Sequence, residues 1–144
     1  NRELFLRRIR QRRIRDCHGD IRPEHICLTD GICIFDCIEF NERFRYSDVA
    51  ADLAFLAMEL DYAKRSDLSQ ILVDRYVKES GDEELRLLLP FYACYRAYIR
   101  GKVESFRLRQ QGPNASATGK ALEAATGYFA LSFAYAEHSR LAAA

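Results

Sequence analysis

Two acidic residues in the first quarter of the chain constrain its fold and chemistry most. Asp20 lies in a loop, with Gly19 before it and Pro23 shortly after it, and Asp36 ends a short apolar run that is typical of a strand. A kinase-type site requires one carboxylate that orients a hydroxyl and a second that holds a metal-nucleotide. The context of these two residues therefore makes phosphoryl transfer the first hypothesis for the sequence.

The overall charge is nearly balanced, with a formal net charge of +1 over 144 residues. This length suits one domain, and 49% hydrophobic and 30% charged residues are ordinary for a globular protein. Residues 1–15 hold seven arginines against one glutamate, and such charges can bind phosphate backbones. Because no aromatic residues alternate with them in a recognised binding module, we do not expect nucleic acid as a partner. A solvated face, or a helix whose partners lie in a missing part of the protein, is the favoured interpretation.

The cysteines and the lack of targeting signals indicate a cytoplasmic protein without a membrane partner. The sequence has no initiator methionine, no signal peptide and no apolar run of membrane-spanning length. Five cysteines are an odd number, so we expect reduced thiols that behave as small buried hydrophobes. Two alternatives stay open, a zinc site and a cysteine nucleophile beside a histidine. The residues concerned are Cys17, His18, His25, Cys27, Cys33 and Cys37.

The first third of the chain predicts a helix, a loop and a hairpin. Apolar residues at helical spacing, among them Leu6 and Ile9, favour a helix over residues 2–14. Two short β-like runs, 26–28 and 32–36, flank Asp30-Gly31, which is a strong hairpin signal. Residues 39–46 are expected to form an irregular connector.

From Ser47 onward the pattern is helical, so the predicted fold class is α+β, mostly α, with a short β-hairpin packed on a helical bundle. Capping, stop and break residues divide the rest of the chain into helices. Pro90 falls inside the third of them and is expected to kink or divide it. The predicted helices cover residues 48–63 (with Val49, Leu53, Leu56 and Leu60 on one face), 66–78 (stopped by Gly81), 82–109 and 116–141 (after a break at Gly112-Pro113-Asn114, with Leu122, Phe129, Phe133 and Ala136 among its apolar positions).

The run His18-Gly19-Asp20, then Pro23, then two short strands ending in Asp36, resembles the catalytic and metal-binding loops of the aminoglycoside phosphotransferase family. That family belongs to the protein-kinase-like fold. A further segment, Asp48 to Ala54, is similar to the family pattern Gly-Asp-Pro-x-x-Asp-Leu-Ala. The resemblance covers residues 16–54, and the helices that follow fit the C-terminal lobe of such a kinase.

The resemblance implies a role for each matching residue. Asp20 would be the catalytic base that positions the acceptor hydroxyl, and Asp36 would bind the Mg²⁺ that bridges the phosphates of ATP. Asp52 would be structural, with its carboxylate accepting bonds from the backbone of the catalytic loop. His18 would also be structural, packed beneath that loop.

One position departs from the family pattern. His25 stands where the family has an asparagine whose amide oxygen completes the metal shell. Mg²⁺ prefers oxygen ligands, whereas imidazole nitrogen suits softer divalent ions such as Mn²⁺. His25 is thus expected to bind such a metal, to approach the phosphates as a donor, or to mark a weakened site. Glu39, three residues after Asp36, could supply a compensating carboxylate or face solvent as a loop residue.

The chain starts almost where a C-terminal lobe starts, so residues 1–144 are expected to be a single domain that lacks its N-terminal lobe. A kinase needs that lobe to cover the phosphates. The fragment alone is therefore expected to be inactive, and the parent to use ATP on a small-molecule hydroxyl. A helix rich in aromatic residues supplies three candidates for the acceptor site, Tyr92, Tyr95 and Arg96. The competing interpretation is that these side chains pack in the core. The alternative function is a non-catalytic, kinase-like interaction or regulatory module.

Overall fold

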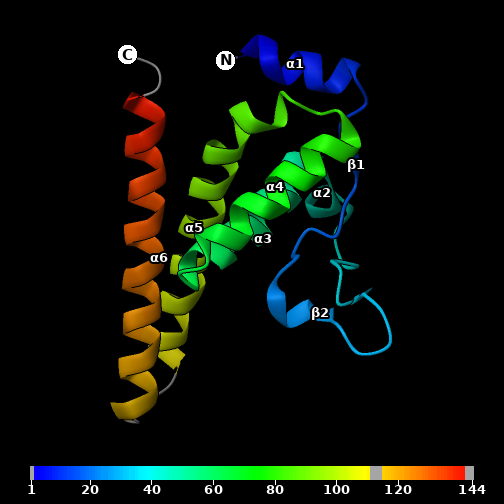
Figure 1. Ribbon diagram of the computed structural model, residues 1–144. Helices are drawn as coiled ribbons and strands as arrows, with labels where there is room; N and C mark the ends of the chain where they lie inside the picture. Colours follow the sequence, from blue (N-terminus) through cyan, green and yellow to red (C-terminus); the bar gives the residue numbers. More distant parts are fainter. Residues whose placement is uncertain (1, 111–114, 142–144) are drawn as a thin grey trace.

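The computed structural model describes residues 2–110 and 115–141, and it is α+β with helices dominant, as predicted. The elements follow one another as a helix, two small sheets joined by loops, and a helical body (Figure 1). The helices are α1 (Arg2–Arg10), α2 (Glu42–Arg45), α3 (Val49–Tyr62), α4 (Ser66–Ser80), α5 (Leu85–Gln110) and α6 (Ala115–Leu141). The strands are β1 (Ile14–Asp16), β2 (Ile26–Cys27), β3 (Cys33–Ile34) and β4 (Tyr46–Asp48), with a 3₁₀ turn at Pro23–His25.

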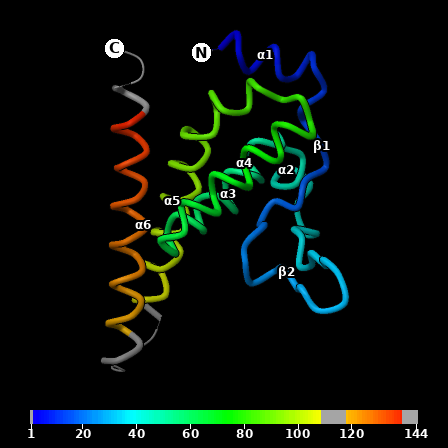
Figure 2. Tube along the Cα trace, viewed as in Figure 1, coloured from blue at the N-terminus to red at the C-terminus, as the bar shows by residue number. Residues whose placement is uncertain are grey.

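The helical body is built around α3. This helix packs against α4 and α5, and α5 continues downward to pair with the antiparallel α6 (Figure 2). The buried side chains form two clusters, one joining α1, α3, α4 and α5 and the other joining α3, α5 and α6. Burial of these apolar side chains is the main force that stabilises the body. Within the described ranges, the chain contains no helix that is both long enough and apolar enough for a membrane span.

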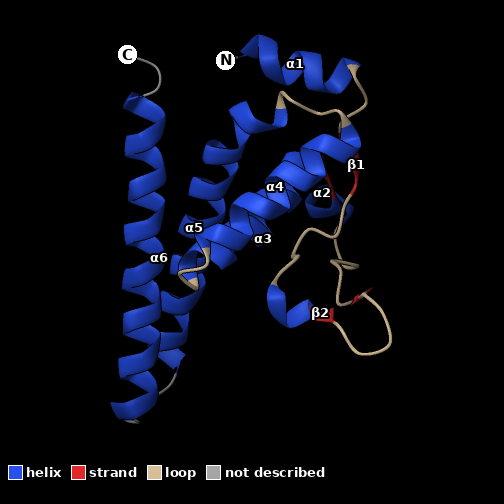
Figure 3. Ribbon diagram, in the orientation of Figure 1, coloured by secondary structure: helices blue, strands red, loops and turns tan. Residues whose placement is uncertain are grey.

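The predicted helix over residues 2–14 is wrong at its end. It ends at Arg10, because Arg12 takes a left-handed backbone conformation (φ 56°) that an α-helix cannot contain. The chain then forms β1, which pairs antiparallel with β4 so that Ile14 lies opposite Asp48. Figure 3 shows this strand beside the loops. Such a pairing joins residues far apart in sequence, which helical periodicity does not reveal.

The hairpin prediction is confirmed, but the strands are shorter than expected. Ile26 pairs with Ile34 and Cys27 with Cys33, so Asp36 follows the strand by two residues instead of ending it. The supposedly irregular segment 39–46 contains the short helix α2 and the start of β4. The Asn41 side chain caps α2 by accepting a hydrogen bond from the Arg43 amide at 3.0 Å.

Most of the later helix boundaries agree with the sequence signals. Asp48 is the N-cap of α3, and Gly81 ends α4 in the left-handed conformation that glycine adopts without strain. The long α5 begins at Leu85, after a turn at residues 82–84, and it runs through Pro90 without being divided. The predicted break at residues 112–114 lies outside the described part of the chain.

The apolar faces predicted from periodicity are only partly correct. In α1, Leu6 and Ile9 are exposed, and the buried face carries Leu4 and Arg8. In α6, the predicted apolar positions Leu122 and Phe133 are exposed, whereas the ring of Phe129 packs over Gly101 of α5. The buried face of this helix carries three small side chains, Ala121, Ala125 and Ser132, and the aromatic Tyr128.

The buried residue Arg8 joins α1 to two other parts of the chain. Its guanidinium donates two hydrogen bonds to the Asp48 carboxylate, at 2.8 and 2.6 Å, and a third to Asp82 at 2.5 Å. Arg8 is 0% exposed, and the two carboxylates are nearly as buried. The arginine-rich start is therefore in part a structural element with partners inside this chain.

Candidate functional site

The loop that carries Asp20 is held by the carboxylate of Asp52, on the first turn of α3. The Asp52 oxygens accept hydrogen bonds from the backbone amides of His18, at 2.7 Å, and Gly19, at 2.9 Å. This is the geometry that the resemblance implied for Asp52. Bonds to an ionised acceptor are stronger than neutral ones, so Asp52 fixes the loop backbone next to Asp20.

Gly19 is required by both conformation and space. Its φ of +82° lies in the left-handed region, and an added Cβ would lie 2.9 Å from the Ile38 side chain and 3.2 Å from the Phe44 carbonyl oxygen. A larger residue would push the Asp20 loop away from the loop that carries Asp36.

Three hydrogen bonds tie these two loops together. The Phe35 amide donates to the His25 carbonyl and the Ile38 amide to the His18 carbonyl, each at 3.0 Å. The His18 side chain adds a third bond, from Nε2 to the Phe35 carbonyl at 2.7 Å. Because a carbonyl only accepts, Nε2 carries the hydrogen, and the ring supports the loop as expected. Asp36 lies between the tied residues, in a left-handed conformation with φ 61°.

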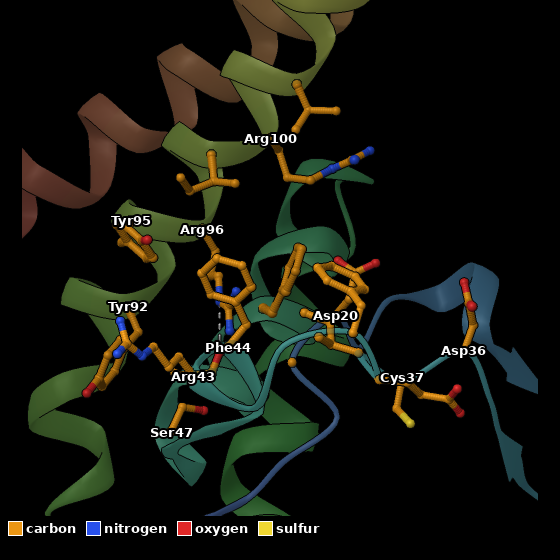
Figure 4. Close-up of a pocket in the computed structure, with 18 residues that line it drawn as sticks. Asp20, Asp36, Cys37, Arg43, Phe44, Ser47, Tyr92, Tyr95, Arg96 and Arg100 are labelled. Atoms are coloured by element: carbon orange, nitrogen blue, oxygen red, sulfur yellow. Dashed lines mark hydrogen bonds between the residues drawn. The ribbon is translucent and has the colours of Figure 1, made fainter.

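Asp20 and Asp36 line one cleft of about 1160 Å³, which α5 closes on the opposite side (Figure 4). Both carboxylates are open to solvent, the Asp36 side chain at 73% exposure and the Asp20 side chain at 36%. The cleft lining also includes Glu39, the possible compensating carboxylate, and the acceptor candidates Tyr92, Tyr95 and Arg96. The structure therefore brings together residues that the sequence predicted from segments far apart.

His25 lies outside the cleft lining, with its ring between the two carboxylates. Its Nδ1 is 2.8 Å from the Asp20 carbonyl oxygen and 3.8 Å from Asp20 Oδ2, and its Nε2 is 3.4 Å from Asp36 Oδ2. The short contact to a carbonyl places the hydrogen on Nδ1 and leaves Nε2 as an acceptor in the neutral ring. Arg22, which the sequence reasoning missed, donates to that nitrogen at 3.1 Å and lies 3.3 Å from Asp20 Oδ2.

These atoms fit a divalent ion held jointly with phosphate oxygens. Asp36 would offer an oxygen ligand; His25 Nε2 would offer a nitrogen ligand, which suits Mn²⁺ better than Mg²⁺, only after the Arg22 guanidinium at 3.1 Å has moved off its lone pair. Across residues 2–110 and 115–141, no cluster of three or more His, Cys, Asp or Glu side chains is arranged to hold a metal. Metal ions at kinase sites commonly use one or two carboxylates, with water and phosphate completing the shell.

The cysteine alternatives gain no support from the geometry. All five cysteines are free, and Cys33 and Cys37 are exposed, so the expectation of buried thiols is wrong for these two. Cys17 Sγ contacts the Ser47 carbonyl oxygen at 3.5 Å, and burial raises the pKa of this thiol. A raised pKa disfavours the thiolate that a nucleophile requires. The adjacent His18 ring is bonded to the Phe35 carbonyl instead.

The α5 wall of the cleft combines aromatic rings with guanidinium groups. Burial raises the pKa of the Tyr92 hydroxyl to about 12, so this hydroxyl stays protonated at neutral pH. Arg100 also lines the cleft but is held by Glu59 at 3.1 Å and by Glu104 at 3.4 Å. The sequence reasoning missed Arg100 and Arg43, because an arginine in a helix or in a polar connector usually indicates a solvated face.

Two mycobacterial proteins are similar to most of this chain. They are the uncharacterized proteins Rv2004c of Mycobacterium tuberculosis and Mb2027c of Mycobacterium bovis, each 42% identical to it over 115 residues. The matched region is 79% of this chain and 23% of each relative, so the chain spans about a quarter of their length. No protein-family model matches the chain, and no solved structure matches it either. The similarity places a region of this kind within longer polypeptides.

Proposed function

We propose that this chain is the C-terminal lobe of a kinase-like phosphotransferase that transfers the γ-phosphoryl group of ATP to a small-molecule hydroxyl. One observation carries the proposal. The Asp52 carboxylate accepts the amides of His18 and Gly19, and the loop it holds presents Asp20 to a cleft that Asp36 also lines. This arrangement supports a site in which one acid positions the acceptor and another meets the metal-nucleotide.

Each residue then has a specific task. Asp20 orients the acceptor hydroxyl and accepts its proton, and Asp36, with His25 Nε2 beside it, would hold the divalent ion. A bound ion would neutralise charge on the phosphate oxygens. Asp52 and His18 keep the two loops in register, which serves a reaction whose catalysis is mostly positioning and charge stabilisation.

A second candidate is a non-catalytic, kinase-like interaction or regulatory module. One observation favours it: Asp20 already has Arg22 and His25 beside it, and Asp36 has His25, so both carboxylates have partners within this chain. In such a module the acids would stabilise the loop and would not take up a metal-nucleotide.

Calorimetry on a full-length polypeptide that carries this chain separates the two candidates. We expect ATP to bind only in the presence of Mg²⁺ or Mn²⁺, with Mn²⁺ giving the tighter binding, and Asp36→Asn to abolish this metal-dependent binding. Asp30→Asn is the matched control, because Asp30 lies at the exposed hairpin turn away from the cleft lining. Nucleotide binding that needs no metal, or no binding at all, would refute the phosphotransferase proposal.

A further inference from the structure

The cleft contains a guanidinium group without a carboxylate partner. Arg96 contacts the Ala51 carbonyl oxygen through a long 3.4 Å bond, and its guanidinium carbon lies 4.8 Å from the centre of the Phe55 ring. In the part of the chain that the structure describes, no carboxylate oxygen lies within 4.0 Å of the Arg96 or Arg43 guanidinium. Burial lowers the pKa of Arg96, although Asp52 and Asp20 lie near enough to oppose that effect.

In the described part of the chain, two other arginines with little solvent exposure are paired with carboxylates. Arg8 has two carboxylates, and Arg100 lies between Glu59 and Glu104. A desolvated cation normally needs such a partner, because burial of an unpaired charge is costly. Arg96 therefore carries a positive charge that an anion entering the cleft can satisfy.

We propose that Arg96 and Arg43 form an oxyanion subsite that holds the carboxylate or phosphate group of the acceptor. This assignment rests on the proposed function, because it places the subsite on the acceptor side of Asp20. In Figure 4, Asp20 lies between Asp36 on one side and the two arginines on the other. An acceptor can thus bind its anionic end to the arginines while its hydroxyl reaches Asp20, and the nucleotide occupies the Asp36 side.

The remaining walls indicate the body of the acceptor. Between the charged groups the cleft is lined by apolar side chains, among them Phe44, Phe55, Ile99 and Val103. A ligand pocket with apolar walls and a few placed charges selects a ligand of the same pattern. The substrate class is therefore a hydroxyl compound with an apolar or aromatic body and one oxyanion, in contrast to a polycationic sugar.

Three probes with one ring in common test the subsite in the full-length polypeptide. Phenylphosphonate and phenylacetate carry an oxyanion, and benzyl alcohol is their uncharged counterpart. We expect both anions to bind at least about tenfold more tightly than benzyl alcohol, because charge-assisted bonds to guanidinium favour the anion. Whichever of the two anions binds with the lower dissociation constant shows whether the acceptor group resembles a phosphate or a carboxylate.

Variants assign the binding to the two arginines. Arg96→Gln should weaken phenylphosphonate binding about tenfold or more, and Arg96→Lys should recover part of it. Arg43→Gln tests the same subsite at an exposed residue whose loss leaves the core intact. Arg75→Gln, at an exposed position on α4 outside the cleft lining, is the matched control and should bind like the unaltered protein.

The outcomes separate this inference from the proposed function. If all three probes bind equally, or if neither arginine variant changes the dissociation constant, the oxyanion subsite is refuted even where metal-dependent ATP binding supports the phosphotransferase. If phenylphosphonate binding depends on Arg96 but ATP does not bind with any metal, the oxyanion site stands and the proposed reaction is refuted.

Discussion

Asp52 has the largest effect of any single side chain on the geometry of the candidate site. Its two oxygens accept the amides that begin the Asp20 loop, and no rotation of an asparagine side chain can replace both acceptors. We expect Asp52→Asn to lower the free energy of unfolding by about 1–3 kcal/mol, because one amide is left facing an NH₂ group. Urea denaturation measures the loss, and amide hydrogen exchange at His18 and Gly19 should accelerate.

The control for Asp52 is Asp30→Asn, which makes the same chemical change in the exposed hairpin turn. Its effect should stay within about 0.5 kcal/mol. Equal unfolding free energies for the two variants would contradict the anchoring role of Asp52.

The buried residue Glu59 should make the free energy of unfolding depend on pH. Its side chain lies against Tyr128 and Arg100, the residue is 6% exposed, and burial raises its pKa although the Tyr128 hydroxyl and Arg100 oppose this. A carboxyl whose pKa is higher in the folded chain stabilises the fold while it is protonated, and this contribution is lost as the pH rises through the folded value. Glu59→Gln should therefore become more stable relative to the unaltered protein as the pH rises above the usual glutamate value of about 4.3.

Urea denaturation at a series of pH values checks the Glu59 prediction. Glu79→Gln, which changes an exposed carboxyl on α4, is the comparison and should show no such trend. A stability difference for Glu59→Gln that does not vary with pH would rule out the raised pKa.

At the scale of elements, Arg8 connects α1 to the start of α3 and to the turn before α5. Removing this arginine leaves the Asp48 and Asp82 carboxylates buried without their cation. We expect Arg8→Met to cost about 3–5 kcal/mol of unfolding free energy, measured by chemical denaturation. Arg10→Met, on the exposed face of the same helix, should change it by less than about 0.5 kcal/mol.

A combined variant tests the reason for that loss. Replacing Asp48 and Asp82 by asparagine together with Arg8→Met removes the buried charges. The asparagine at position 48 can still cap α3, because its side-chain oxygen can accept the bond that Asp48 accepts from the Ala50 amide. Stability should recover in part. If the triple variant is less stable than Arg8→Met alone, uncompensated charge is not the cause.

For the whole molecule, the features that could be predicted from the sequence are those that depend on residues close together in the chain. The Asp30-Gly31 hairpin, the Asp48 cap and the Gly81 stop each depend on neighbouring residues, and each is present in the structure. The pairing of β1 with β4 and the burial of Arg8 depend on residues far apart in sequence. Periodicity counts a charged residue as exposed, so it assigned the wrong face to α1.

In the candidate site, too, some residues could be identified from their neighbours in the sequence and others only from the fold. The acids could be identified from their loop context and from the resemblance, and the structure places Asp20 and Asp36 on one cleft. Their partner Arg22, and the arginines at positions 43 and 100, carry no signal that separates them from solvated surface charges. Only the fold brings Arg43 and Arg100 to the cleft and Arg22 against Asp20.

Formation of ADP from ATP by a full-length polypeptide that carries this chain tests the central claim most directly. With Mg²⁺ or Mn²⁺ present and water or a hydroxy acid as acceptor, we predict turnover that Asp20→Asn lowers by a factor of about 10² or more, since a general base contributes that much. Asp30→Asn should retain the full rate. Turnover that Asp20→Asn leaves unchanged, or an unaltered protein that forms no ADP with either metal, would contradict the account.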